Sequence, residues 1–151
     1  MKMKKRSWLR KFGEAFVPML LFAGMFIITG CYETGVFLDS PVAGLTYSTV
    51  YKDQTVTAQT NEDGMFFYAR GQSVTFSIGS LALGTVAGKS VITPMDLFPD
   101  AAGTSDPRVV NMCVLLQTLD QDGDLNNGIQ ITKAIADIVS TAGTIHFNQT
   151  T

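Results

Sequence analysis

Short runs of alternating side chains constrain the fold of this chain more than any other feature of its sequence. In the run 73–78, the apolar residues Val74, Phe76 and Ile78 alternate with serine and threonine. Such alternation places the apolar side chains on one face of a strand, where they can be buried together. Together with similar runs before and after it, this pattern predicts a small antiparallel β-sandwich over residues 31–98.

Five further runs have the composition of strands, because they are rich in β-branched, aromatic or other apolar residues. These runs are residues 45–51, 55–57, 65–68, 81–83 and 90–93. Between the second and the third run lies Asn61-Glu62-Asp63-Gly64. An Asp-Gly pair supplies the positive φ angle that a tight turn needs, so we expect these two strands to form a hairpin.

The character of the chain changes after Pro99, where helical signals replace the alternating runs. Asp106 and Pro107 predict a helix start, with the aspartate as N-cap and the proline in the first turn. The apolar residues that follow at helical spacing are Val109, Met112, Cys113, Leu116 and Leu119. A second helix is expected from Thr132, as its cap, to about Ser140. The prediction for residues 99–151 is therefore a helix-loop-helix unit that packs on the sandwich, in a mainly β fold.

The first thirty residues have the organisation of an export signal. Six lysines and arginines within residues 2–11 precede an apolar run of 14 residues at positions 15–28. A bilayer span needs about 20 such residues, so the run fits a cleaved signal helix better than a permanent anchor. From Cys31 onward the chain holds five basic and twelve acidic residues, a net charge of −7. That charge disfavours any role that requires binding to nucleic acid phosphates.

The leader ends in Ile28-Thr29-Gly30-Cys31, which resembles the lipobox of bacterial lipoproteins. The resemblance implies cleavage between Gly30 and Cys31 and a diacylglyceryl thioether on Cys31, with palmitate among the acyl chains. An uncleaved leader with an incidental cysteine is the alternative. Tyr32 stands where an aspartate would retain such a protein at the inner membrane. We therefore expect a membrane-anchored protein of the cell envelope, at the outer membrane or the cell surface.

An aspartate-rich loop separates the two predicted helices. Asp120, Asp122 and Asp124 alternate along it, and Asn126 follows at the same spacing. A turning loop can direct these oxygen ligands inward, and calcium suits them better than magnesium because it accepts irregular geometry. The pattern departs from a regular EF-hand, since Ile131 stands where that motif has a bidentate glutamate. The alternative is a solvated acidic turn, in which aspartate and asparagine are present for their turn-forming hydrogen bonds.

No arrangement of residues typical of an enzyme appears in the sequence. His146 is the single histidine, which excludes a zinc cluster built on several histidines. Neither a nucleophile elbow nor a lysine-containing phosphate loop is present. Cys113 is expected to be a small buried side chain on its helix, without a disulfide partner if Cys31 carries lipid. We therefore expect a protein that is not an enzyme.

Several segments resemble a module found in bacterial secreted and surface lipoproteins. The resemblance extends over residues 36–129, and its main segments are 38–47, 60–66, 74–79 and 115–124. The front half is also similar to the carboxypeptidase-regulatory-like, or prealbumin-type, sandwich, in which a Gly-x-x-Tyr strand is followed by an Asp-Gly-x-Phe hairpin. This resemblance implies a β-sandwich that belongs to an adhesin-like or envelope protein.

Three functions follow as expectations. The first is a lipid-anchored structural or interaction module without catalysis, whose partner is an unidentified protein or surface ligand. The second is a calcium-dependent binding module that uses the loop from Asp120 to Asn126. The third is the truncated N-terminal part of a larger secreted enzyme or adhesin, because the irregular residues 144–151 have the character of an interruption.

Overall fold

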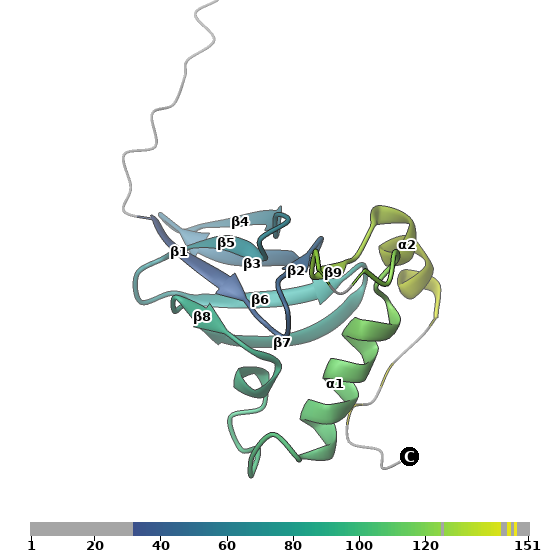
Figure 1. The fold of residues 1–151 in the computed structure, drawn as a ribbon. Coiled ribbons are helices and arrows are strands. Elements are labelled where there is room, and N and C mark those ends of the chain that lie inside the picture. The colour runs from purple at the N-terminus through teal and green to yellow at the C-terminus, as the bar shows by residue number, and fades with distance from the viewer. Residues whose placement is uncertain (1–31, 125, 143–144, 146, 148–151) are drawn as a thin grey trace, which may run out of the picture.

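The alternating runs form strands in the computed structural model, which describes residues 32–124, 126–142, 145 and 147. The fold is mainly β, with two sheets packed as a sandwich and two α-helices after them, as predicted (Figure 1). The predicted signal helix of residues 1–30 lies outside the described residues.

Two sheets make up the sandwich. In the three-stranded sheet, β1 (Tyr32–Phe37) pairs antiparallel with β5 (Met65–Ala69) and parallel with β8 (Val91–Ile92). The four-stranded sheet has the order β4-β3-β6-β7, and every pairing within it is antiparallel. Its strands are β3 (Thr46–Tyr51), β4 (Gln54–Gln59), β6 (Ser73–Ile78) and β7 (Leu81–Ala87).

The hairpin predicted across residues 61–64 is wrong, because β4 and β5 belong to different sheets. Instead β4 pairs with β3 through a turn at Lys52 and Asp53, whose φ angles are 48° and 61°. The Asn61 side-chain oxygen accepts hydrogen bonds from the backbone nitrogens of Asp63 and Met65, at 3.1 and 2.8 Å. The 61–64 turn therefore forms locally, but it carries the chain from one sheet to the other.

Aromatic side chains from both sheets fill the space between them. Phe76 of β6 lies with its ring centroid 4.9 Å from that of Phe37 in β1 and 5.2 Å from that of Phe66 in β5. All three side chains are fully buried. Val74 and Ile78, which alternate with polar residues in β6, are fully buried as well, so the predicted apolar face of this strand is confirmed.

Both α-helices begin directly after the capping residues that the sequence indicated. A 3-10 helix, η1 (Pro94–Leu97), precedes α1 (Pro107–Thr118) and α2 (Lys133–Thr141). The Asp106 carboxylate accepts a hydrogen bond from the Arg108 backbone nitrogen at 2.9 Å, and Thr132 caps α2. Both α-helices contribute to the sandwich core, through Met112, Leu116, Ala136 and Val139.

A short parallel pairing that the sequence did not reveal ties the aspartate-rich loop to the sandwich. It joins β2 (Val42–Ala43) to β9 (Ile129–Gln130). The Ile129 nitrogen donates to the Pro41 carbonyl at 2.9 Å, next to the end of β1. The loop and α2 consequently lie at the opposite end of the sandwich from the start of β1 (Figure 1).

Candidate functional site

The predicted lipid attachment site adjoins the first strand of the fold. Gly30 and Cys31 lie outside the described residues, and Tyr32, the next residue, begins β1. The Tyr32 ring stacks on Tyr51 with a centroid distance of 4.4 Å, and Lys52 Nζ lies 5.2 Å from the Tyr51 ring centroid. None of the described helices combines the length and hydropathy needed to cross a bilayer. The sandwich therefore begins directly after the predicted attachment residue, without an intervening linker.

In the aspartate-rich loop, hydrogen bonds from nearby groups occupy Asp122 and Asp124. Asp122 accepts from the backbone nitrogen of Asp124 at 3.0 Å and from the Asn127 side chain at 2.8 Å. These two donors hold the pKa of Asp122 below its usual range, with the backbone bond as the larger cause. Asp124 Oδ1 accepts from the backbone and side-chain nitrogens of Asn126, at 3.0 and 2.7 Å. Both carboxylates thus shape the turns of the loop.

Asp120 has a different role from the other two aspartates. Its Oδ1 accepts a hydrogen bond from the Gln130 backbone nitrogen at 2.9 Å, which holds the start of the loop against β9. Within residues 32–124 and the later described positions, no three His, Cys, Asp or Glu side chains gather as a metal site requires. The assignment of Asp120, Asp122, Asp124 and Asn126 to calcium therefore stays a prediction.

An acidic hollow of about 880 Å³ lies beside the aspartate-rich loop. Glu62 and Asp63, from the turn between β4 and β5, line it together with Asp122 and Asn127 from the loop. No lysine or arginine is among the described residues that line this hollow. Sequence reasoning missed the association because the two segments lie far apart in the chain and neither contains a signal for the other. The hollow is suited to polar or positively charged ligands.

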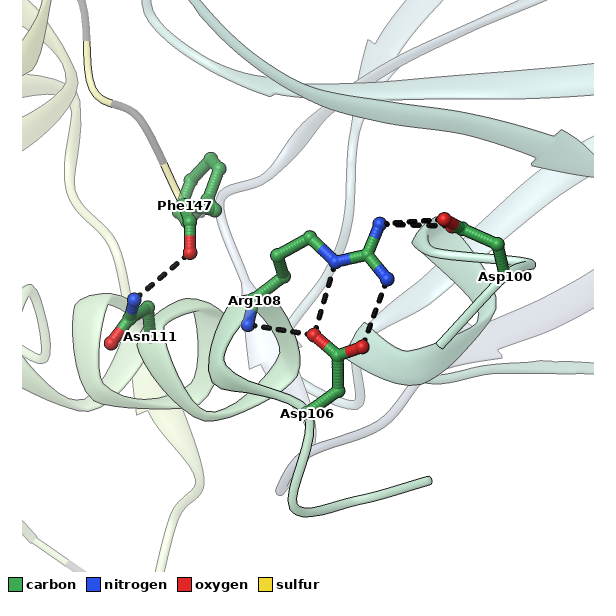
Figure 2. A network of polar contacts seen from close by, with 5 residues as sticks. All are labelled: Asp100, Asp106, Arg108, Asn111 and Phe147. Atoms are coloured by element: carbon green, nitrogen blue, oxygen red, sulfur yellow. Dashed lines mark hydrogen bonds and ion pairs between the residues drawn. The ribbon is translucent and has the colours of Figure 1, made fainter. Parts of the chain in front are cut away.

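A second polar cluster surrounds Arg108 at the start of α1 (Figure 2). The Arg108 guanidinium donates to Asp106 at 2.8 Å and to Asp100 at 2.9 Å. The bonds from Arg108, first from its side chain and then from its backbone, lower the pKa of Asp106 to about 2. In the same helix, the Asn111 side chain donates to the Phe147 carbonyl at 2.9 Å. These contacts fasten α1 to the segments around it, so we assign the cluster a structural role.

Cys113 is half-buried on α1, where the sequence predicted a buried side chain. Burial, followed by the nearby carboxylate of Asp39, raises the pKa of the Cys113 thiol to about 11. The thiol is therefore protonated at neutral pH, and a protonated thiol is a poor nucleophile. His146, the other residue with catalytic potential, lies outside the described residues.

The chain was compared with models of protein families, with curated proteins and with solved structures, and none of them matches it. The resemblance to surface lipoproteins and to the prealbumin-type sandwich consequently stays a prediction from the sequence.

Proposed function

We propose that this protein is a lipid-anchored protein of the bacterial cell envelope, whose sandwich is a structural or interaction module without catalytic activity. The observation that carries the proposal is the order of the N-terminal segment. A basic stretch, a short apolar run and Ile28-Thr29-Gly30-Cys31 end one residue before β1 begins at Tyr32. Export followed by lipidation at Cys31 would leave a folded domain attached directly to the membrane, with the outer membrane or the cell surface as its location.

Two properties of the domain support a role in structure or interaction. The half-buried thiol of Cys113 has a pKa of about 11, which keeps it from acting as a nucleophile at neutral pH. The acidic hollow is lined by residues from three segments, which follow β1, β4 and α1, at the end of the sandwich away from Tyr32. That end lies away from the predicted attachment residue, where it is accessible to an unidentified protein or surface ligand.

Metabolic labelling with radioactive palmitate in a bacterial host tests the anchor. The wild type should incorporate label and Cys31→Ala should not, because the thioether forms on that sulfur. Cys113→Ala is the matched control and should label like the wild type. Mass spectrometry of the wild-type protein should also give a mature N-terminus at residue 31. Equal labelling of the wild type and Cys31→Ala would refute the anchor.

A second candidate function is calcium-dependent binding at the aspartate-rich loop. The observation in its favour is that Asp122 lines the same hollow as Glu62 and Asp63, which concentrates negative charge beside the aspartate-rich loop. If calcium binds the folded state alone, at 100 times its dissociation constant it adds about 2.7 kcal/mol to stability. The melting temperature should then rise with calcium in the wild type and rise less in Asp122→Asn. Identical melting curves with calcium and with a chelator would exclude this candidate.

A further inference from the structure

The outer face of the three-stranded sheet is apolar and uncovered by the described part of the chain. In these strands Phe37, Phe66 and Ile92 point into the core and are fully buried, so their neighbours point outward. The side chains of this outward surface, here called the β1 face, are Val36, Met65, Phe67 and Val91, together with the exposed Leu38 that directly follows β1. The register places Val36 directly between Met65 and Val91, which makes the surface continuous across all three strands.

Large apolar side chains on the β1 face are open to solvent. The exposed fractions are 51% for Phe67, 44% for Val91 and 40% for Leu38. Thr34, which pairs with Phe67, is also exposed and carries no charge. A cluster of exposed apolar residues on one sheet face is typical of a surface that contacts a partner or a membrane.

The opposite outer surface of the sandwich has a different composition. Along β6 its outward positions are Ser73, Thr75 and Ser77, and the hydroxyl groups of Thr75 and Thr85 lie 2.8 Å apart across β6 and β7. Val50 is an exposed apolar residue of this four-stranded sheet, but serine, threonine and glutamine predominate there. One outer face is thus suited to water, whereas the β1 face is suited to an apolar surface.

The position of the predicted anchor identifies what covers the β1 face. This step rests on the proposed function, because it requires lipid on Cys31. That residue directly precedes Tyr32 of β1, so the strand that forms the middle of the apolar face begins at the membrane. Strands advance about 3.3 Å per residue, so the whole face lies within about 25 Å of the attachment point.

The two ends of the sandwich differ in charge. Lys52 and Arg70 lie at the end of the sandwich where β1 begins, since Ala69 pairs with Tyr32. The Arg70 side chain is 85% exposed and forms an ion pair with Glu33 at 2.7 Å, and Asp53 follows Lys52, so the charges at this end balance. Glu62 and Asp63, which line the acidic hollow, lie at the other end, because Met65, two residues after Asp63, pairs with Val36 near the end of β1. An anionic membrane surface would repel the hollow more than the end that carries Lys52 and Arg70, so the end where β1 begins should lie nearest the membrane.

The geometry points to the β1 face as a membrane-docking surface: the lipid on Cys31 holds the domain at the bilayer, and the sandwich lies on it with Phe67, Val91 and Leu38 against the lipid. Interfacial apolar side chains enter about 5–10 Å into the boundary between headgroups and acyl chains. In this orientation the polar outer face of the four-stranded sheet is directed away from the membrane.

Site-specific fluorescence tests the orientation on lipidated mature protein, reconstituted into vesicles of phosphatidylethanolamine and phosphatidylglycerol. With Cys113→Ala as the background, an environment-sensitive fluorophore is attached at Thr34→Cys on the β1 face. Thr57→Cys, at an exposed position of β4, is the matched control. We expect a blue-shifted emission at position 34 and a loss of fluorescence when the vesicles contain a nitroxide lipid, with neither effect at position 57. Adding Phe67→Ser and Val91→Ser should reduce both effects at position 34, while the thermal melting curve reports on the fold.

Palmitate incorporation at Cys31 separates failure of this inference from failure of the proposed function. If the protein is labelled with palmitate but the nitroxide lipid does not quench position 34, the anchor stands and the docking surface is refuted. A blue shift at position 34 without quenching by the lipid means that a second copy or another protein covers the face, which also refutes it. Equal quenching at positions 34 and 57 excludes the orientation.

Discussion

At the scale of single residues, Thr60 stabilises the fold through two buried hydrogen bonds, although it lies in a segment between strands. Its side chain is 4% exposed and lies between two backbone groups. The hydroxyl donates to the Val42 carbonyl at 2.6 Å and accepts from the Leu45 nitrogen at 3.0 Å, and both bonds are buried. One hydroxyl group therefore satisfies a donor and an acceptor that water does not reach.

Replacing this hydroxyl group should expose its contribution to stability. In Thr60→Val the shape is nearly unchanged, but two buried backbone groups lose their partner, so we expect a loss of about 3 kcal/mol. Thr60→Ser is the matched control, because it keeps both hydrogen bonds and should lose only about 1 kcal/mol with the missing methyl group. Denaturant unfolding of both variants measures the difference. Equal losses would show that the hydrogen bonds are unimportant.

The ion pair between Asp106 and Arg108 predicts a dependence of stability on pH. The pKa of Asp106 is about 2 in the folded protein, compared with about 3.9 for an aspartate in an unfolded chain. Its contribution is therefore fully present above the unfolded value and is lost as the pH falls toward 2. At neutral pH, Asp106→Asn should have a lower melting temperature than the wild type. The difference between the two melting temperatures should narrow when the pH falls below about 4.

Thermal melting between pH 7 and pH 3 checks this expectation. Asparagine also caps helices well, so the comparison isolates the charge rather than the N-cap. The control repeats the comparison in a protein that lacks the guanidinium. The melting temperature of Arg108→Gln is compared with that of the double variant Arg108→Gln, Asp106→Asn. The difference between these two melting temperatures should narrow far less as the pH falls. A difference in melting temperature that stays constant with pH in the wild-type background would contradict the assignment of the pKa shift to Arg108.

At the scale of elements, two glycines of the aspartate-rich loop are needed for different reasons, one for its backbone conformation alone and one also for close packing. Gly123 and Gly128 have φ angles of 65° and 80°, a region that other residues rarely adopt. A methyl group added at Gly123 would meet open space, whereas at Gly128 it would overlap the Pro41 carbonyl oxygen. Gly128 thus allows the loop to approach the end of β1, next to the pairing of β2 with β9.

Alanine substitutions at these two glycines should therefore lower the free energy of unfolding by different amounts. Gly123→Ala should lose about 1 kcal/mol, from the left-handed conformation alone. Gly128→Ala should lose about 2 kcal/mol more, because the loop backbone must also move away from Pro41. Denaturant unfolding measures both losses, and amide exchange at Ile129 and Ile131 reports on the pairing with β2. Equal losses for the two variants would mean that the contact with Pro41 is dispensable.

The sequence predicted those elements whose cause is local. The alternation in β6 and the caps at Asp106 and Thr132 act over a few residues, and each was found where it was expected. The predicted pairing of β4 with β5 was wrong, because the Asp-Gly signal determines a turn but not the sheet to which the next strand belongs. The acidic hollow and the pairing of β2 with β9 depend on contacts between distant segments, for which the sequence holds no local signal.

At the scale of the whole molecule, the described parts of the two predicted units, 31–98 and 99–151, share one core. Buried side chains from both sheets and from both α-helices belong to a single cluster. Leu116 of α1 is fully buried in this cluster, whereas Val114 of the same helix is 55% exposed. Because the helices complete the core, the sandwich and the helices are expected to unfold together.

Leu116→Ala should destabilise the entire domain by about 2–5 kcal/mol, since it leaves a cavity in the shared core. Val114→Ala removes apolar atoms from the exposed side of the same helix and should change stability by no more than about 0.5 kcal/mol. Far-ultraviolet circular dichroism follows the helices, and near-ultraviolet dichroism follows the tyrosines of the sandwich, such as Tyr47. Both signals should move to a lower melting temperature together in Leu116→Ala, because a cavity in one core weakens every element that packs on it. Separate transitions in the two signals would mean that the helices form an independent unit.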